Sequence, residues 1–288
     1  MNKFFNIEDL YKEKTDKGIL PREQSNNEAH IKMANDLKTH LKKSEEELIC
    51  NLETNQIEYQ KNYLNTNGIT FTEEEASFLR VKLYKEWFYK SNYYNKLKLQ
   101  SDNCCYCFIG PVDELDHFFN KDDNPELSVC NVNLVPTCDK CNKKKPQVVT
   151  YLHPYYEEDI SKIDWLQCAF DWKGFEGQPI PIFNIVKPTS MSDAMFKKLE
   201  SQLPRNDIIK KMTKESSDYI SSHWKSWKHQ AKTTHKEDFK WAIQLDYEGC
   251  RDNYGINTWE YKIHQNLYEN FDIFFKSLKK REFDVLTN

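Results

Sequence analysis

Two cysteine pairs constrain the fold of this chain more than any other feature. Cys104-x-x-Cys107 and Cys138-x-x-Cys141 lie roughly thirty residues apart. A C-x-x-C turn presents two thiolates to one ion without strain, and two such turns supply the four ligands that Zn²⁺ binds at tetrahedral corners. A segment this small buries little apolar area, so a metal cross-link would supply much of its stability. We therefore predict a structural Zn²⁺ site formed by these four cysteines.

The overall use of cysteine favours metal binding over disulfides. The chain has nine cysteines, an odd number, and begins "MNKFFNIEDLYKEKTDKG", without the long apolar run of a secretory leader. We expect a cytoplasmic protein with no membrane partner, in a compartment where thiols stay reduced. Cys105 could replace Cys104 as a ligand, although Cys105-x-Cys107 is the poorer turn. Cys130 is expected to pack in the interior, with a smaller chance of lying near the zinc.

Composition indicates a globular protein and excludes a strongly basic one. Hydrophobic residues make up 39% of the 288 residues and aromatic residues 14%, so a core can form if Phe, Tyr and Trp supply much of its volume. The formal net charge of −4 gives no general attraction to a polyanion. Any contact with nucleic acid must therefore come from local clusters of basic residues.

The chain is predicted to be an α+β protein, mainly helical, with a small mixed module embedded in it. We expect an N-terminal helical region over residues 1–100, the cysteine module over 101–156, and a mainly helical C-terminal region over 157–288. A short strand is predicted near 180–187, where apolar residues alternate between prolines. The first helix is indicated by apolar residues at roughly helical intervals, namely Ile31, Leu37, Leu41 and Leu48.

A second helix is predicted to start at Thr72, after a turn at 65–68. Thr72 is a good N-cap followed by an acid-rich first turn. An apolar face follows, and lysines and tyrosines occupy the last turns. We expect this helix to pack on the core, and the alternative is a Lys- and Tyr-lined helix leading into a DNA-binding module. The apolar face consists of Phe78, Leu79, Leu83, Trp87 and Phe88.

Polar residues between and beside the cysteine pairs require a separate explanation. Asp116 and His117 lie side by side between the pairs, Asn133 follows, and Asn142 comes directly after Cys141. A purely structural zinc site needs none of them. If all four thiolates bind Zn²⁺, the acid and the histidine lie outside the zinc site, where a rigid metal cross-link would hold them in position.

These residues carry a resemblance to a known family. "ELDHFFNK … NVNLVPTCDKCNKKK" resembles the motif of HNH, or ββα-metal, nucleases, in the subset whose hairpin and helix are pinned by two C-x-x-C pairs. The resemblance covers roughly forty residues. It implies an embedded ββα-metal module and a metal-dependent endonuclease that hydrolyses DNA phosphodiester bonds, leaving a nick or a double-strand break.

The resemblance also implies a role for each residue. His117 matches the general base that takes a proton from the attacking water. Asp116 matches the acidic ligand of a catalytic Mg²⁺ or Mn²⁺, and Asn142 matches the second protein ligand. Asn133 matches the residue that steadies the loop and the orientation of the base. A histidine often stands where this chain has Asn142, and oxygen ligands should favour Mg²⁺ or Mn²⁺ over Zn²⁺ or Ni²⁺.

Basic and histidine residues flanking the motif allow two interpretations each. Lys143, Lys144 and Lys145 continue from Asn142 and could hold neighbouring phosphates of DNA, or could form a solvated lysine run. His153 is expected to pack beside the module or to support the site.

A wider resemblance concerns the biological role. "YLHPYYEE … PIFNIVKPTSMSDAMFKKLESQL" is similar to bacterial HNH proteins of anti-phage defence systems, including the PtuB-type partners of Septu ATPases. It implies a defence effector controlled by a companion ATPase or other protein. The tryptophans of the C-terminal region could form a core or a docking face for that companion or for a second copy. Two other functions stay open, a zinc-stabilised binding module without catalysis and an RNase toxin using the same site.

Overall fold

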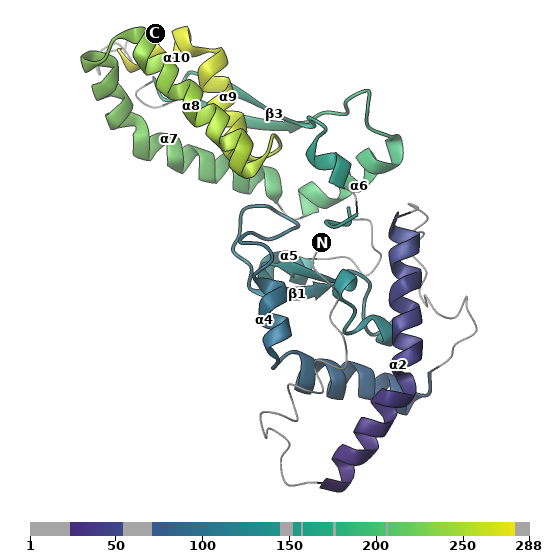
Figure 1. The fold of residues 1–288 in the computed structure, drawn as a ribbon. Coiled ribbons are helices and arrows are strands. Elements are labelled where there is room, and N and C mark those ends of the chain that lie inside the picture. The colour runs from purple at the N-terminus through teal and green to yellow at the C-terminus, as the bar shows by residue number, and fades with distance from the viewer. Residues whose placement is uncertain are drawn as a thin grey trace. The chain divides into compact units, whose positions relative to one another are not determined.

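The computed structural model describes residues 24–53, 71–144, 152–156, 158–174, 177–205 and 207–279. The chain divides into two compact units, Met1–Tyr156 and Glu157–Asn288. Among the described residues, each unit combines helices with one two-stranded antiparallel sheet (Figure 1). The mainly helical α+β class predicted from the sequence agrees with this architecture.

The first unit contains the long helix α2, Gln24–Glu53. Its apolar positions face inward, with Leu37, Leu41 and Leu48 buried. The helix packs against two short 3₁₀ helices, η2 at Pro125–Leu127 and η3 at Asn131–Asn133. The amphipathic helix predicted from the apolar spacing is thus confirmed.

The predicted second helix is in fact three consecutive elements. They are α3 (Glu73–Ser77), the π-helix η1 (Phe78–Phe88) and α4 (Asn92–Lys98). The N-cap at Thr72 is confirmed: its Oγ1 accepts a hydrogen bond from the Glu75 N–H, and the Glu75 carboxylate accepts one from the Thr72 N–H. The break comes at Ser91, whose hydroxyl donates to the Phe88 carbonyl and accepts from the Tyr94 N–H, so that it caps a new helix.

One face of these helices belongs to the core of the first unit. All five apolar residues predicted for that face are buried, and they pack with residues of α2 and with Leu115 and Leu134. The expected core packing of this segment is therefore confirmed.

A small hairpin followed by a short helix lies beside this core. Strand β1 (Glu114–His117) pairs antiparallel with β2 (Leu134–Thr137), with His117 opposite Leu134. Helix α5 (Asp139–Lys144) follows directly. Pro136 is tolerated in β2 because a two-stranded sheet has only edge strands, so a missing N–H need not break the ladder.

The second unit has its own hairpin and core. Strand β3 (Leu166–Asp171) pairs antiparallel with β4 (Ile180–Ile185), and helices α7 and α9 contact this sheet. Strand β4 confirms the predicted strand, whereas β3 was not predicted. The helical elements of this unit are η4 (Glu158–Ser161), α6 (Asp193–Arg205), α7 (Ile208–Thr233), α8 (Lys236–Tyr254), α9 (Trp259–Glu269) and α10 (Phe271–Leu278).

Tryptophans of the second unit mostly serve its core. Trp224 and Trp227 on α7 are buried and pack against Phe274 of α10. Trp241 on α8 is different, with 62% of its surface exposed. Of the two interpretations left open by the sequence, the core applies to the pair on α7, whereas Trp241 is not part of the core.

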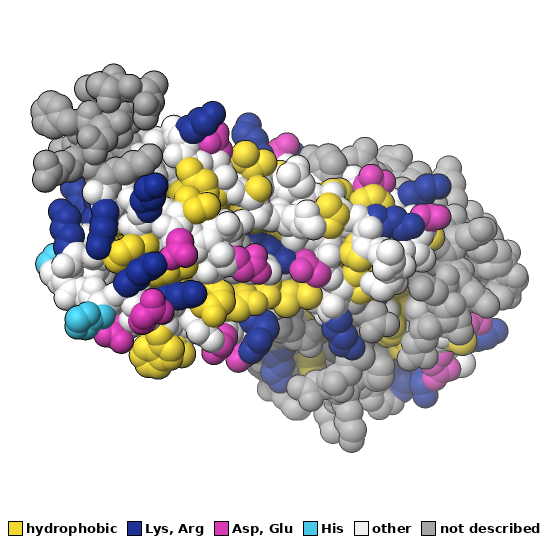
Figure 2. Space-filling model, turned by 90° about the horizontal axis from the view of Figure 1, so that it is seen from above, with side chains coloured by type: hydrophobic (Ala, Val, Ile, Leu, Met, Phe, Trp, Pro, Cys, Tyr) yellow, Lys and Arg dark blue, Asp and Glu magenta, His cyan; other side chains and the backbone are white. Residues whose placement is uncertain are grey.

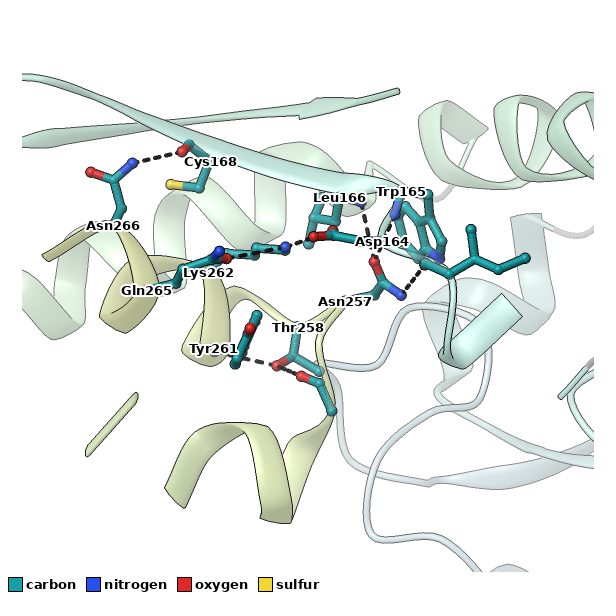
Figure 3. Close-up of polar contacts among 12 residues, drawn as sticks. Asp164, Trp165, Leu166, Cys168, Asn257, Thr258, Tyr261, Lys262, Gln265 and Asn266 are labelled. Atoms are coloured by element: carbon teal, nitrogen blue, oxygen red, sulfur yellow. Dashed lines mark hydrogen bonds and ion pairs between the residues drawn. The ribbon is translucent and has the colours of Figure 1, made fainter. Parts of the chain in front are cut away.

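A buried asparagine joins the start of β3 to the loop before α9 (Figure 3). The Asn257 side-chain oxygen accepts hydrogen bonds from the N–H groups of Trp165 and Leu166, each at 3.1 Å. Its amide nitrogen donates to the carbonyls of Ile160 and Ile163. One side chain therefore bonds two buried backbone N–H groups and two partly buried carbonyls.

The described surface carries charges of both signs. On the face shown in Figure 2, Lys and Arg side chains alternate with Asp and Glu, and hydrophobic side chains lie between them. Such mixing agrees with the small net charge of −4. None of the described helices is both long and apolar enough to cross a bilayer.

Candidate metal centre and adjoining cavity

The four cysteines of the two C-x-x-C pairs converge on one point of the first unit. All four are buried, and their Sγ atoms lie within 4.8 Å of one another. The Cys107 and Cys138 Sγ atoms are 3.9 Å apart. Tetrahedral Zn²⁺ with bonds of about 2.3 Å requires sulfurs about 3.8 Å apart, whereas a disulfide requires about 2.05 Å. The cluster therefore has the geometry to bind Zn²⁺.

Backbone groups support these sulfurs. The Tyr106 N–H donates to Cys104 Sγ at 3.4 Å, and the Gly110 N–H donates to Cys107 Sγ at 3.5 Å. A side chain at Gly110 would meet Cys138 Cβ at 3.3 Å and its Sγ at 3.4 Å, tighter than ordinary contacts. Glycine lets this loop approach the metal site closely.

The pKa values of two thiols in the cluster are shifted in opposite directions. Hydrogen bonds from Cys104 and Cys141 hold the pKa of the Cys107 thiol well below its usual range. Hydrogen bonds to Cys104 and Cys107 raise the pKa of Cys141. A Zn²⁺ ion, when bound, supplies the positive charge that lets all four sulfurs exist as thiolates in a buried place.

The two neighbouring cysteines lie outside the cluster. Cys105 is partly buried, and burial raises the pKa of its thiol to about 11. Cys130 is buried against α2, with its Sγ 3.8 Å from the Glu45 carboxylate. The expected packing role of Cys130 is therefore confirmed.

A cavity of about 640 Å³ opens in the same unit. It contains three of the four residues to which the resemblance assigns catalytic roles: Asp116, His117 and Asn142. The walls come from η1, α4, β1, the loop after β1, and α5. The other lining residues are Tyr84, Lys85, Tyr89, Lys90, Tyr94, Glu114, Leu115, Phe118, Asn120 and Lys121.

His117 is held in one orientation at the end of β1. Its Nε2 lies 2.9 Å from the Ser128 carbonyl oxygen, and its ring packs edge-on against Tyr84 with centroids 4.5 Å apart. A carbonyl only accepts hydrogen bonds, so Nε2 must carry the proton. In the neutral ring the basic lone pair therefore lies on Nδ1.

Asp116 is connected directly to the metal-binding loop. Its Oδ2 accepts a 2.7 Å hydrogen bond from the hydroxyl of Tyr106, which lies between Cys104 and Cys107 in sequence. Tyr106 is fully buried, and burial, followed by the charge of Asp116, raises the pKa of its hydroxyl well above the ordinary value. The neutral phenol is thus kept as a donor to the carboxylate.

Asn142 is held by a residue that the sequence interpretation missed. Its side-chain N–H donates to Glu114 Oε1 at 2.8 Å, which directs the amide group of α5 toward β1. Glu114 and Asp116 are two residues apart on a strand, so both carboxylates lie on the same face. That spacing is the signal that could have identified Glu114 from the sequence.

Asn133 is buried outside the cavity lining and organises the turn between the strands. Its Oδ1 accepts from the Phe119 N–H at 2.7 Å, and its Nδ2 donates to the carbonyls of Phe119 and Leu127. These bonds tie Phe119 and Leu127 to Asn133, and Leu127 directly precedes Ser128, the partner of His117.

The remaining basic and histidine residues singled out in the sequence are Lys143, Lys144, Lys145 and His153. Lys143 lies on the exposed side of α5, where it pairs with Asp139 at 2.8 Å, and this hydrogen bond raises the pKa of its ammonium group. Lys144 is exposed on the same helix, and Lys145 lies outside the described residues. His153 is buried, with Nε2 2.9 Å from the Val132 carbonyl oxygen, and packs on Phe118, as the packing interpretation expected.

Comparison with known proteins gives one partial similarity. The chain is similar to protein ea31 of Escherichia phage lambda, with 31% identity over 146 residues that cover 40% of this chain and 49% of the phage protein. The chain therefore spans about half the length of this relative. No protein-family model matches the chain, and no solved structure matches it.

Proposed function

We propose that this chain is a metal-dependent endonuclease of the HNH type that hydrolyses phosphodiester bonds of DNA. The observation that carries the proposal is the shared cavity: Asp116 and His117 from β1 and Asn142 from α5 line one space. The element order of strand, strand and helix, with one C-x-x-C pair before the hairpin and one at the helix, agrees with the resemblance.

The proposed base is the Nδ1 atom of His117. Hydrolysis needs a water that loses its proton as it attacks phosphorus. The bond from Nε2 to the Ser128 carbonyl keeps the proton on Nε2 and directs basicity to Nδ1. The same carbonyl stabilises the positive charge that the ring acquires when it takes the proton from water.

The proposed ligands of the catalytic ion are Asp116 and Asn142. Their donor atoms are oxygens, which suits Mg²⁺ or Mn²⁺, and Glu114 adds a second carboxylate on the same strand. When bound, the ion supplies positive charge that offsets the charge developing on the phosphate and the leaving oxygen. Tyr106 and Glu114 hold the two ligands in position.

Cleavage of supercoiled plasmid in Mg²⁺, Mn²⁺, Zn²⁺ or Ni²⁺ tests this proposal. We expect cleavage in Mg²⁺ or Mn²⁺ and little in Zn²⁺ or Ni²⁺. Asp116→Ala and Asn142→Ala should reduce cleavage by about a hundredfold while zinc content stays that of the parent. Parallel reactions with tRNA and ribosomal RNA identify an RNase, and preference for RNA would reject the DNA assignment.

A zinc-stabilised binding module without catalysis is the second candidate. The observation that favours it is that, within the described ranges, three or more His, Cys, Asp or Glu ligand atoms converge only at the four cysteines. Such a module predicts nucleic-acid or protein binding that survives loss of both Asp116 and His117, with no cleavage in any metal.

The role in anti-phage defence, with a companion ATPase, is proposed from the sequence resemblance. It is tested by challenging cells with phage while they express the chain with and without the proteins encoded beside it. Protection that requires both the companion and His117 supports the role. Protection that persists in His117→Ala cells would separate the defence role from nuclease activity.

A further inference from the structure

The π-helix η1 contributes to the cavity as well as to the core. Its cavity side carries tyrosine and lysine, and its core side is apolar. Tyr84 and Lys85 of η1 and the two residues that follow the helix, Tyr89 and Lys90, all line the cavity, and both lysines are exposed. The apolar residues of the same helix are buried in the core, except Val81, which is 44% exposed. The helix is therefore both a core element and a wall of the candidate site.

The π-helical geometry explains why these residues lie together. In η1 the Tyr89 N–H donates to the Tyr84 carbonyl five residues earlier, at 2.8 Å. In an α-helix, residues five apart would point about 140° away from each other, given 3.6 residues per turn. The five-residue turn that this bond closes places Tyr89 near Tyr84, and Lys90, the next residue, lines the same cavity as Lys85.

A third lysine faces the cavity from the loop after β1. Lys121 Nζ lies 5.8 Å from the centre of the Tyr84 ring, within the range of a cation–π contact. Arg80 of η1 donates to the Asp122 carbonyl at 3.3 Å and so ties this loop to the helix. The lysines that line the cavity thus come from two separate segments, the loop after β1 and the C-terminal end of η1.

Tyr89 forms an exposed aromatic surface that is supported from behind. It is 53% exposed, and its ring lies 4.6 Å from that of Tyr94. Tyr94 is buried, and its hydroxyl accepts a hydrogen bond from the Leu115 N–H of β1. The ring of Tyr89 is therefore held at a defined place beside the strand that carries Asp116 and His117.

The charged residues of the cavity are suited to binding a phosphodiester chain. Of the cavity residues, Lys85, Lys90 and Lys121 are cationic, and Glu114 and Asp116 are anionic. Under the proposed function a divalent ion would offset the two carboxylates, which leaves the lysines to bind phosphates. Lysines interleaved with an exposed aromatic ring are the combination that binds unpaired strands, because every base can stack on the ring.

We propose that this wall of η1 binds an unpaired stretch of nucleic acid, with Lys85 and Lys90 on successive phosphates and a base stacked on Tyr89. The proposal rests on the proposed function and deepens it, since it selects single-stranded segments as the form that reaches His117. It assigns substrate binding to a helix outside the HNH-like hairpin.

Fluorescence anisotropy with a labelled twelve-nucleotide DNA strand and its duplex tests the proposal. The His117→Ala protein is used without added Mg²⁺, so that no cleavage interferes. We expect the single strand to bind more tightly than the duplex. Lys85→Gln/Lys90→Gln should weaken binding of the strand at least tenfold and lower the slope of log K against log salt by about 1.4. Tyr89→Ala should weaken it about tenfold, and Tyr89→Phe should restore binding.

The matched control is Lys82→Gln/Lys96→Gln, which removes the same charge from η1 and α4 outside the cavity. Zinc content and melting temperature of all variants should equal those of the parent. The proposal is overturned if the cavity double variant binds like the control, or if the duplex binds more tightly and Tyr89→Ala has no effect. Failure of the proposed function is seen separately, as cleavage that survives His117→Ala.

Discussion

The hydroxyl of Tyr106 donates a 2.7 Å hydrogen bond to the carboxylate of Asp116. Tyr106 lies within the first C-x-x-C turn, so this bond connects the cysteine cluster directly to the cavity. The position of the Asp116 carboxylate therefore depends on the position of the metal-binding loop.

Tyr106→Phe should weaken binding of the proposed catalytic ion while preserving zinc. The substitution keeps the buried ring and removes only the hydroxyl that orients Asp116. Bonds to metal ligands of this kind typically contribute tenfold to a hundredfold in affinity or activity. We expect the Mg²⁺ concentration for half-maximal cleavage to rise about tenfold, with unchanged zinc content. An unchanged Mg²⁺ dependence would show that the bond has no positioning role.

Cys138→Ser should remove the zinc and destabilise the first unit. The four thiols are buried, and the binding free energy of the ion they hold adds to the free energy of folding of the first unit. We expect metal analysis to find about one zinc per parent chain and little in the variant, with a lower melting temperature. Cys105→Ser, at a cysteine outside the cluster, is the control and should keep its zinc. Equal zinc in both variants would contradict the assignment of ligands.

Asn257→Ala should destabilise the second unit by about 2 to 3 kcal/mol, because two buried and two partly buried backbone groups lose their partners. Six of the seven tryptophans lie beyond residue 157, so urea unfolding followed by tryptophan fluorescence reports mainly on this unit. Asn253→Ala, on the exposed side of α8, serves as the control and should change stability by less than about 0.5 kcal/mol. Equal midpoints for the two variants would refute the role of Asn257.

Glu126 should make the first unit less stable as pH rises. The residue is buried, its Oε1 has no hydrogen-bond partner among the residues that the structure describes, and burial raises the pKa of its carboxyl to about 7. Between about pH 4.5 and 7 the folded state then binds more protons than the unfolded state, so the free energy of unfolding falls as pH rises.

The difference between the parent and Glu126→Gln measures this contribution. The amide has a similar shape and never ionises. We expect the parent to lose about 2 to 3 kcal/mol more than the variant between pH 5 and pH 8, measured by urea unfolding. Glu74→Gln, at an exposed residue of α3, should follow the parent. Parallel pH profiles for the parent and Glu126→Gln would contradict the raised pKa.

Local sequence patterns predicted several elements because the physics that forms them is local. A C-x-x-C turn brings two thiols together, and two turns suffice for a cluster once the hairpin closes. Thr72 followed by Glu75 specifies a helix start through bonds within four residues. The apolar stripes of α2 and η1 predicted which faces would be buried.

Other features depend on contacts between distant segments and could not be predicted in this way. The bond from Tyr106 to Asp116 requires the register of the hairpin against the cysteine loop. Lys121 approaches the lysines of η1 only because the loop after β1 folds onto that helix. The lysine run after Asn142 was considered for phosphate binding because it is adjacent to Asn142 in sequence. The π-helix itself replaces an expected α-helix, and the sequence contains no residue pattern that we can connect to it.

The most direct test of the account is plasmid cleavage by the parent and by His117→Ala at matched zinc content. Removing the imidazole takes away the proposed base without touching the four cysteines. The account predicts Mg²⁺- or Mn²⁺-dependent cleavage by the parent and a loss of about a hundredfold or more in the variant, with equal zinc content and with both proteins assayed below their melting temperatures. Cleavage by His117→Ala at the rate of the parent would contradict the central claim.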